Sequence, residues 1–257
     1  TEVDTLSLHD ALPILKRGEI KMNSKSLLID FDDTIVDFHD AESHAFFKMT
    51  ERYKLIANHD DLKTFMKVNQ AHWEAFQINK LTKEEVLSKR FEVYFDLHEM
   101  TVDGKEADHI FRDELAKAPI KFFPDTVETL KYLKQNHDLY IVTNGVLETQ
   151  KRRIEKAQFG QLFKGVFVSE QTGYQKPMTE FFDYVFKEIG EDKRDNAIIV
   201  GDSMTSDILG GKNAQIDTCW FNPRNKINET DIKPDFTITS LNELLDRKST
   251  RLNSSHL

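Results

Sequence analysis

Two carboxylates stand two residues apart at the end of a short apolar run, Leu27 to Ile29, in the stretch that continues Asp30-Phe31-Asp32. On an extended backbone, side chains two positions apart point to the same side, so Asp30 and Asp32 are expected to face one space. Like charges this close raise each other's pKa unless a cation compensates them. The pair therefore indicates a cation-dependent site, although an Asp-x-Asp pattern also arises by chance in a chain with 44 acidic residues.

Three further polar clusters follow segments with the pattern of buried strands, or stand in the loops after them. They are, in chain order, Thr143-Asn144, Lys176, and Gly201-Asp202-Ser203 with Asp207. Each cluster alone has a structural explanation, such as a turn, a solvated helix start or a helix cap. In doubly wound sheets, however, ligands bind beyond the carboxyl ends of the strands. The joint occurrence of the clusters at such ends favours one shared site.

The elements that must position these clusters alternate between strand and helix from residue 122 onward. Short apolar runs bounded by turns predict strands over residues 27–29, 139–142, 165–169, 197–200, 217–221 and 236–239. This alternation predicts an α/β fold with a doubly wound parallel sheet and helices on both faces. Residues 205–214 are expected to form a helix whose small side chains let it pack closely on the sheet. A capping box at 240–243 is expected to open a last helix.

A different pattern fills residues 38–119, between the first strand and the rest of the sheet. Apolar residues recur there at helical spacing, and Thr82 to Glu85 have the sequence of a capping box. We therefore predict an all-helical cap over 38–119, inserted into a core made of residues 22–37 and 120–246. The histidines of the insert show no paired metal-binding spacing, so no zinc site is expected.

The composition is typical of a soluble globular protein, with 257 residues, 31% of them charged, 39% hydrophobic, and a net charge of -9. A negative surface argues against binding of nucleic acid polymers or anionic membranes, but it allows a small phosphorylated substrate. No apolar run approaches the ~20 residues of a membrane span, and no secretory signal is recognisable. The single cysteine, Cys219, is expected to be a buried thiol and favours a cytoplasmic location.

The two ends of the chain fit neither pattern. Residues 1–21 show weak periodicity, and Met22 stands just before the first strand. Residues 6–14 and 249–256 resemble translated sequencing-adaptor sequence of the kind found at the ends of gene models. We expect residues 1–21 and 247–257 to be extraneous or disordered tails, which the intact mass of the native protein would test.

Taken together, the four clusters resemble the motifs of the haloacid dehalogenase-like hydrolase superfamily, in its phosphatase branch with a helical cap after the first strand. The matching motifs are Asp30-Phe31-Asp32-Asp33-Thr34, Thr143-Asn144, Lys176-Pro177, and Gly201-Asp202-Ser203 through Asp207. The resemblance runs from about residue 25 to residue 245. The chain also resembles, less specifically, the pyrimidine 5'-nucleotidases that clear noncanonical nucleotides, and this similarity lies at residues 143–146, 211–214 and 218–223.

The resemblance implies that two aspartates carry out the chemistry. Asp30 is expected to attack phosphorus and form an aspartyl-phosphate. Asp32 is expected to protonate the leaving oxygen and then to activate the water that cleaves the intermediate. Asp33 and Asp37 are expected to be structural.

The resemblance also implies how charge is compensated. Mg²⁺ is expected on Asp30, on the backbone carbonyl of Asp32, and on Asp202. Three residues are expected to bind the phosphoryl group, namely Thr143, Asn144 and Lys176. Asp207 is expected behind them, anchoring Lys176 or a metal-bound water.

Asp32 favours a phosphatase over a dehalogenase, because the dehalogenases of the superfamily lack an acid at this position and halide leaves without a proton. The expected substrate is a nucleoside monophosphate with a pyrimidine base. A sugar phosphate or phosphoglycolate is the alternative substrate class, and a catalytically silent binding protein is a third possibility. The sequence leaves open whether the protein is a monomer or a homodimer, and which cap residues contact substrate.

Overall fold

The computed structural model describes residues 26–245, so the predictions for both tails lie outside the described residues. Six parallel strands within this range form one sheet in the order β3-β2-β1-β4-β5-β6. The strands are β1 Ser26–Ile29, β2 Asp138–Thr143, β3 Gly165–Val168, β4 Ala197–Gly201, β5 Asp217–Phe221 and β6 Phe236–Ile238. The predicted doubly wound parallel sheet is confirmed, with β1 and β4 at its centre.

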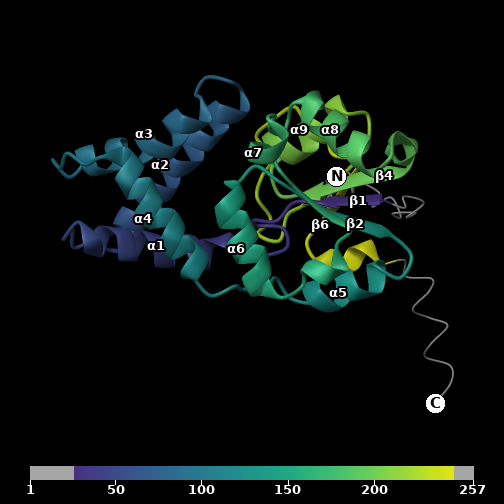
Figure 1. Cartoon of the computed structure of the whole chain (residues 1–257), viewed down its shortest axis with the longest axis horizontal. Coiled ribbons are helices and arrows are strands. Elements are labelled where there is room, and N and C mark those ends of the chain that lie inside the picture. The colour runs from purple at the N-terminus through teal and green to yellow at the C-terminus, as the bar shows by residue number, and fades with distance from the viewer. Residues whose placement is uncertain (1–25, 246–257) are drawn as a thin grey trace, which may run out of the picture.

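Helices cover both faces of this sheet, with α8 and α9 on one face and α5 and α6 on the other (Figure 1). Leu27 and Ile29 of β1 join an apolar cluster with α5 and α6, whereas Leu28 joins one with Phe181 and Phe182 of α8. A strand covered on both faces is apolar throughout, which explains the uninterrupted run in the sequence. The core helices are α5 Thr126–Leu133, α6 Leu147–Ala157, α7 Ser169–Thr172, α8 Thr179–Ile189 and α9 Leu209–Asn213.

The helix predicted over 205–214 is present in two parts. A π-helical turn, Met204–Ile208, leaves the loop after β4 and passes directly into α9. A Cβ atom at Gly211 would lie 2.5 Å from the side chain of Ile199, which is well inside contact distance. The missing side chain therefore lets the helix approach β4, as its small residues predict. Cys219 is buried in β5, also as predicted.

Both predicted capping boxes are present. Thr82 accepts a hydrogen bond from the backbone of Glu85, whose carboxylate accepts one from the backbone of Thr82, and α3 starts there. Ser240 and Glu243 form the second box. It opens a single 3₁₀ turn, Leu241–Leu244, in the described part of the chain, and not the longer helix that was predicted.

Four of the helices that follow β1 in the described chain precede α5 and stand to one side of the sheet (Figure 1). They are α1 Phe38–Arg52, α2 His59–Gln77, α3 Lys83–Asp96 and α4 Gly104–Lys117. They enclose an apolar cluster of their own, which includes the buried rings of Phe46, Phe65 and Phe111. Most aromatic side chains here pack the insert itself, and 38–119 remain the predicted limits of the cap. Among residues 26–245, no helix has the length and apolar character needed to cross a membrane.

A buried polar chain connects the four helices of this insert. Asn69 of α2 donates to Glu42 of α1 at 2.6 Å, and Arg90 of α3 donates to Asn69 at 2.8 Å. Arg90 also donates to Asp108 of α4 at 2.6 Å. Each helix contributes one member, and all four members are buried. Because buried polar groups need partners, this chain favours one mutual arrangement of the helices.

Candidate active site

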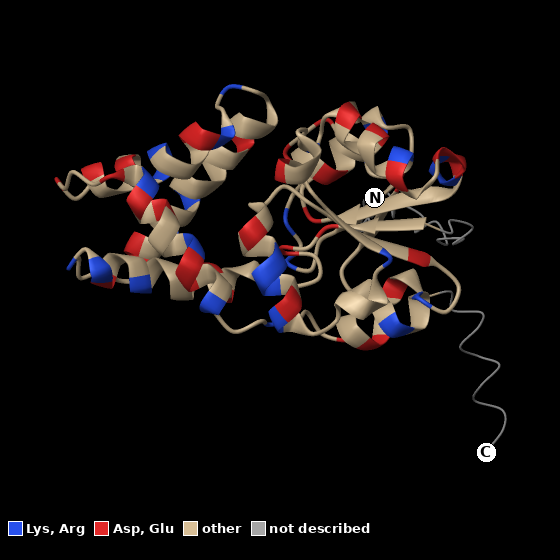
Figure 2. Cartoon of the chain, in the orientation of Figure 1, with Lys and Arg blue, Asp and Glu red and all other residues tan. Residues whose placement is uncertain are grey.

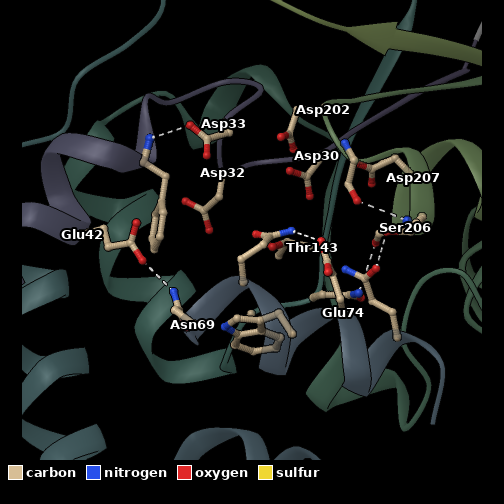
Figure 3. Close-up of a pocket in the computed structure, with 18 of the residues that line it drawn as sticks. Asp30, Asp32, Asp33, Glu42, Asn69, Glu74, Thr143, Asp202, Ser206 and Asp207 are labelled. Atoms are coloured by element: carbon tan, nitrogen blue, oxygen red, sulfur yellow. Dashed lines mark hydrogen bonds between the residues drawn. The ribbon is translucent and has the colours of Figure 1, made fainter. Parts of the chain in front are cut away.

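The carboxyl ends of β1, β2 and β4 open into a cavity of about 750 Å³, which the insert helices border on the opposite side. The cavity is lined by every predicted site residue, namely Asp30, Asp32, Thr143, Asn144, Lys176, Asp202 and Asp207. Figure 3 shows the carboxylates of Asp30, Asp32 and Asp202 turned toward a common space. The structure thus brings together residues from four separate stretches of the chain.

Lys176 is a buried cation at the centre of the site, and only 1% of its surface is exposed. Its Nζ lies 2.7 Å from Asp30 Oδ1 and 2.7 Å from Asp207 Oδ1, and it donates to the carbonyl of Val142 at 2.8 Å. These three acceptors use all three protons of an ammonium group. Burial alone would lower the pKa of Lys176, but Asp207 and Asp30 raise it above its usual value. Lys176 is therefore held charged.

The carboxylates around Lys176 carry more negative charge than it can balance. Burial raises the pKa of Asp30 to about 8, although Lys176 opposes this shift. Burial, with the charges of Asp33 and Asp207, raises the pKa of Asp202 well above its usual value. Oxygen atoms of Asp30, Asp202 and Asp207 lie within 4.8 Å of one another. Excess negative charge and oxygen-only donors suit a hard divalent cation, so these residues fit the predicted Mg²⁺.

The loop after β5 brings two cations to the mouth of the cavity. Lys226 Nζ lies 3.6 Å from Asp202 Oδ2, with about half of its side chain exposed. Arg224 pairs with Asp33 at 3.1 Å and with Asp37 at 2.8 Å. Asp33 and Asp37 lie close enough to His39 for the three to hold an ion, but Arg224 already pairs with both carboxylates. These contacts support the structural role expected for Asp33 and Asp37.

Asn144 ties the end of β2 to the loop that carries Lys176. Its Oδ1 accepts from the backbone N–H of Lys176 at 2.9 Å, and its Nδ2 donates to the carbonyl of Lys176 at 2.8 Å. Both ends of the amide therefore bind the lysine backbone. The side chain fixes Lys176 relative to β2, while its contact with a phosphoryl group remains a prediction.

Two residues of α6 complete the site, and the sequence analysis did not identify them. Gln150 Nε2 donates to Asp32 Oδ2 at 2.8 Å and to Thr143 Oγ1 at 2.9 Å. Arg153 donates to Asp32 Oδ1 at 2.5 Å. Figure 2 shows basic stretches of α6 beside acidic loop segments at the strand ends. A signal was present, because polar residues three positions apart on a helix share a face, and α6 starts directly after the Thr143-Asn144 cluster.

The insert contributes a polar wall opposite the strand ends. Figure 3 shows Glu42 hydrogen-bonded to Asn69 at the edge of the cavity. Trp73 of α2 also lines the cavity. Burial raises the pKa of Glu42 to about 7, against the opposing effect of Asn69. Thr205, in the π-helical turn after β4, donates to Gln77 of α2 at 2.7 Å and so bridges the two sides. Sequence periodicity identified these helices but not the residues that face the cavity.

Comparison with known proteins identifies the family of this chain. A sequence model described as haloacid dehalogenase-like hydrolase matches residues 25–215. The HAD-hydrolase YfnB of Bacillus subtilis is 39% identical over 220 residues, which cover 86% of this chain and 93% of YfnB. A crystal structure of YfnB bound to magnesium superimposes with a TM-score of 0.81, covering 86% of this chain and 96% of that one.

Two bacterial nucleotidases are also similar over most of the chain. The pyrimidine 5'-nucleotidase PynA of Streptococcus pneumoniae is 30% identical, and the match covers 86% of this chain and 94% of PynA. The pyrimidine 5'-nucleotidase YjjG of Escherichia coli is 28% identical, with 85% of this chain and 95% of YjjG covered. The similarity therefore includes the insert as well as the strand-end motifs.

The raised pKa of Glu42 predicts a pH-dependent effect of Glu42→Gln on stability. The pKa of Glu42 is about 7 in the native protein, whereas the ordinary pKa of a glutamate is 4.5. The wild type therefore loses stability as the pH rises from 4.5 to about 7, because the buried carboxyl resists ionisation. Glu42→Gln keeps an acceptor for Asn69 without the charge. Urea unfolding should show the variant close to wild type at pH 4.5 and about 2 kcal/mol more stable at pH 8.

The exposed Glu74, on the same wall of the cavity, provides the matched control. Glu74→Gln should show the same difference from wild type at both pH values. An equal difference for Glu42→Gln at pH 4.5 and pH 8 would show that burial does not perturb Glu42.

Proposed function

Because this chain belongs to the haloacid dehalogenase-like hydrolase family, we propose that it hydrolyses phosphate monoesters, with pyrimidine nucleoside 5'-monophosphates as preferred substrates. The observation that carries the proposal is the placement of two different carboxylates at the end of β1. Asp30 is buried against Lys176, whereas Asp32 is turned toward α6 and is partly exposed. One fits a nucleophile and the other an acid and base.

Asp30 is the nucleophile in this proposal. Lys176 binds its Oδ1 at 2.7 Å, which fixes the carboxylate and leaves Oδ2 for attack on phosphorus. A bond forms between Asp30 and phosphorus as the ester bond to the leaving oxygen breaks. In this proposal the Lys176 ammonium and the Thr143 hydroxyl stabilise the negative charge on the phosphoryl oxygens.

Asp32 moves the protons in both halves of the reaction. It gives its proton to the leaving alkoxide, so that the product departs as an alcohol. It then takes a proton from the water that attacks the aspartyl-phosphate, which releases inorganic phosphate and restores Asp30. Its partly exposed side chain, at 27%, is compatible with contact to both substrate and water.

Asp30, Asp202 and the backbone carbonyl of Asp32 would hold Mg²⁺, which when bound neutralises charge between a carboxylate nucleophile and a phosphate dianion. The support for this part is the fit of the donor set and the magnesium in the structure of YfnB. Asp207 anchors Lys176 at 2.7 Å and also accepts from the backbone N–H of Ser203 at 3.1 Å.

The substrate class rests on the cavity and on the relatives. About 750 Å³ is within the range of small-molecule sites and exceeds what a phosphate group alone needs. The wall formed by Glu42, Asn69 and Trp73 offers hydrogen-bonding groups and an aromatic face to a leaving group. The names of PynA and YjjG favour pyrimidine nucleotides, with sugar phosphates as the alternative. The single cysteine of the sequence favours a cytoplasmic enzyme.

Replacing the nucleophile should abolish turnover. Asp30→Asn keeps the shape of the side chain but removes the attacking charge, so kcat on UMP should fall by at least about 1,000-fold. The same change at the exposed Asp40, outside the cavity, should leave kcat near wild type. Substantial activity in Asp30→Asn, measured as phosphate release, would refute the nucleophile assignment.

Removal of divalent metal should inactivate the enzyme reversibly. After dialysis against EDTA, phosphate release should be lost, and added Mg²⁺ should restore it. Mg²⁺ should also raise the melting temperature of wild type, because it relieves repulsion among buried carboxylates, but not that of Asp202→Asn. Full turnover in EDTA would exclude the proposed role of Asp202.

A substrate panel should separate the two substrate classes. We expect kcat/KM for UMP and dUMP to exceed that for phosphoglycolate and glyceraldehyde 3-phosphate by at least about tenfold, or ~1.4 kcal/mol of transition-state binding. If the nucleotides are no better than the small phosphates, the nucleotidase proposal fails while the phosphatase proposal stands.

A further inference from the structure

Both carboxylate oxygens of Asp32 are hydrogen-bonded to α6. Asp32 Oδ2 accepts from Gln150 Nε2 at 2.8 Å, and Asp32 Oδ1 accepts from Arg153 at 2.5 Å. Gln150 and Arg153 are 2% and 1% exposed, whereas the Asp32 side chain is 27% exposed. Two buried donors therefore hold a carboxylate that still reaches the cavity.

The chemistry of the donors fixes the orientation of the Gln150 amide. An arginine has donors and no acceptor, and its NH1 lies 3.1 Å from Gln150 Oε1, which must accept. The NH₂ end of Gln150 then faces Asp32 and Thr143, with one hydrogen for each. Thr143 Oγ1 is the acceptor in this contact, so its own hydroxyl hydrogen is available to donate elsewhere. Arg153 thus orients Gln150, and Gln150 orients Thr143.

Packing alone does not require a guanidinium at position 153. Arg153 lies over the rings of Phe31 and Phe38, at 5.0 and 5.2 Å, where an apolar side chain of similar length would also fit. Its Nε has no hydrogen-bond partner among the described residues. Burying a charge carries a desolvation penalty that often exceeds the gain from its ion pair. The contact with Asp32 therefore points to function more than to stability.

We propose that Gln150 and Arg153 are positioning residues, which hold Asp32 in place for proton transfer and turn the hydroxyl hydrogen of Thr143 toward the phosphoryl group. An ionised carboxylate has about four acceptor positions, and the two donors occupy one on each oxygen. The remaining positions can carry the proton to and from the reacting oxygens. This inference rests on the proposed phosphatase function. It adds which residues orient the proposed acid, Asp32, and the proposed phosphate-binding residue, Thr143.

The test compares two esters that differ in their need for an acid. A nucleoside 5'-monophosphate releases an alkoxide that must be protonated, whereas 2,4-dinitrophenyl phosphate releases a stable phenolate. The measured quantity is kcat/KM, which reports on phosphoryl transfer and not on the later hydrolysis. Arg153→Met should lower kcat/KM for the nucleotide at least about tenfold more than for the dinitrophenyl ester.

Gln150→Leu should give a different pattern, because Gln150 serves both Asp32 and Thr143. It should lower kcat/KM for both esters through Thr143, with the larger loss again for the nucleotide. Lys151→Met is the matched control, since Lys151 is exposed on the same helix and the change removes the same charge. The control should leave both values near wild type.

Equal losses on both esters, or no loss on either, would overturn the proposal, since a merely structural role does not distinguish leaving groups. If Arg153→Met does not fold, as judged by circular dichroism, Arg153→Lys keeps a cation near Asp32 but not the planar guanidinium that fixes the direction of its donors. It should show a smaller loss that is still selective for the nucleotide, and an unselective loss would again overturn the proposal. A wild type that hydrolyses neither ester would instead reject the phosphatase function itself.

Discussion

The site depends on one buried ammonium that is shared by two carboxylates. Lys176 reaches Asp30 and Asp207 at 2.7 Å each, in a position from which water is excluded. Removing Lys176 would leave two buried carboxylates without their cation, and breaking a buried ion pair in this way typically costs about 3–5 kcal/mol. Neighbouring groups stabilise this contact. The side chain of Asn144 is hydrogen-bonded to the backbone of Lys176, and the N–H of Ser203 donates to Asp207. The parallel sheet brings these distant segments to one edge.

The same contact leaves a charge imbalance that has chemical consequences. Lys176 cannot neutralise Asp202 as well as Asp30 and Asp207, and burial raises the pKa of Asp30 and of Asp202. Such a site favours an added divalent cation, which is the basis of the proposed Mg²⁺ binding. Asp32 lies outside this buried group, where it is hydrogen-bonded to α6 and partly exposed to the cavity.

The predictable parts of the protein are those that local patterns determine. Apolar runs and turn residues identified all six strands, and the polar residues at their ends identified the lining of the cavity next to the sheet. Gln150 and Arg153 were not identified, because their role depends on how α6 is rotated over the sheet. The same holds for Glu42 and Asn69, since helical periodicity shows that a face is buried but not which partner buries it. Asn144 was predicted as a site residue, but its hydrogen bonds with the backbone of Lys176 are seen only in the three-dimensional structure.

The strand-end carboxylates and the opposite wall of the cavity are held in place by different kinds of contact. The proposed nucleophile and acid, Asp30 and Asp32, follow the end of β1, whose distance from β2 and β4 is fixed by backbone hydrogen bonds that hardly depend on side-chain identity. The opposite wall is held by the Glu42–Asn69–Arg90–Asp108 chain, with one residue from each insert helix. A substitution in that chain can shift one helix against the others without disturbing the sheet. Such a shift would change the wall of the cavity while the sheet still holds Asp30 and Asp32. It would reach the core through the contacts that couple the two sides, among them Gln77 with Thr205 and Lys83 with the carbonyl of Gly145.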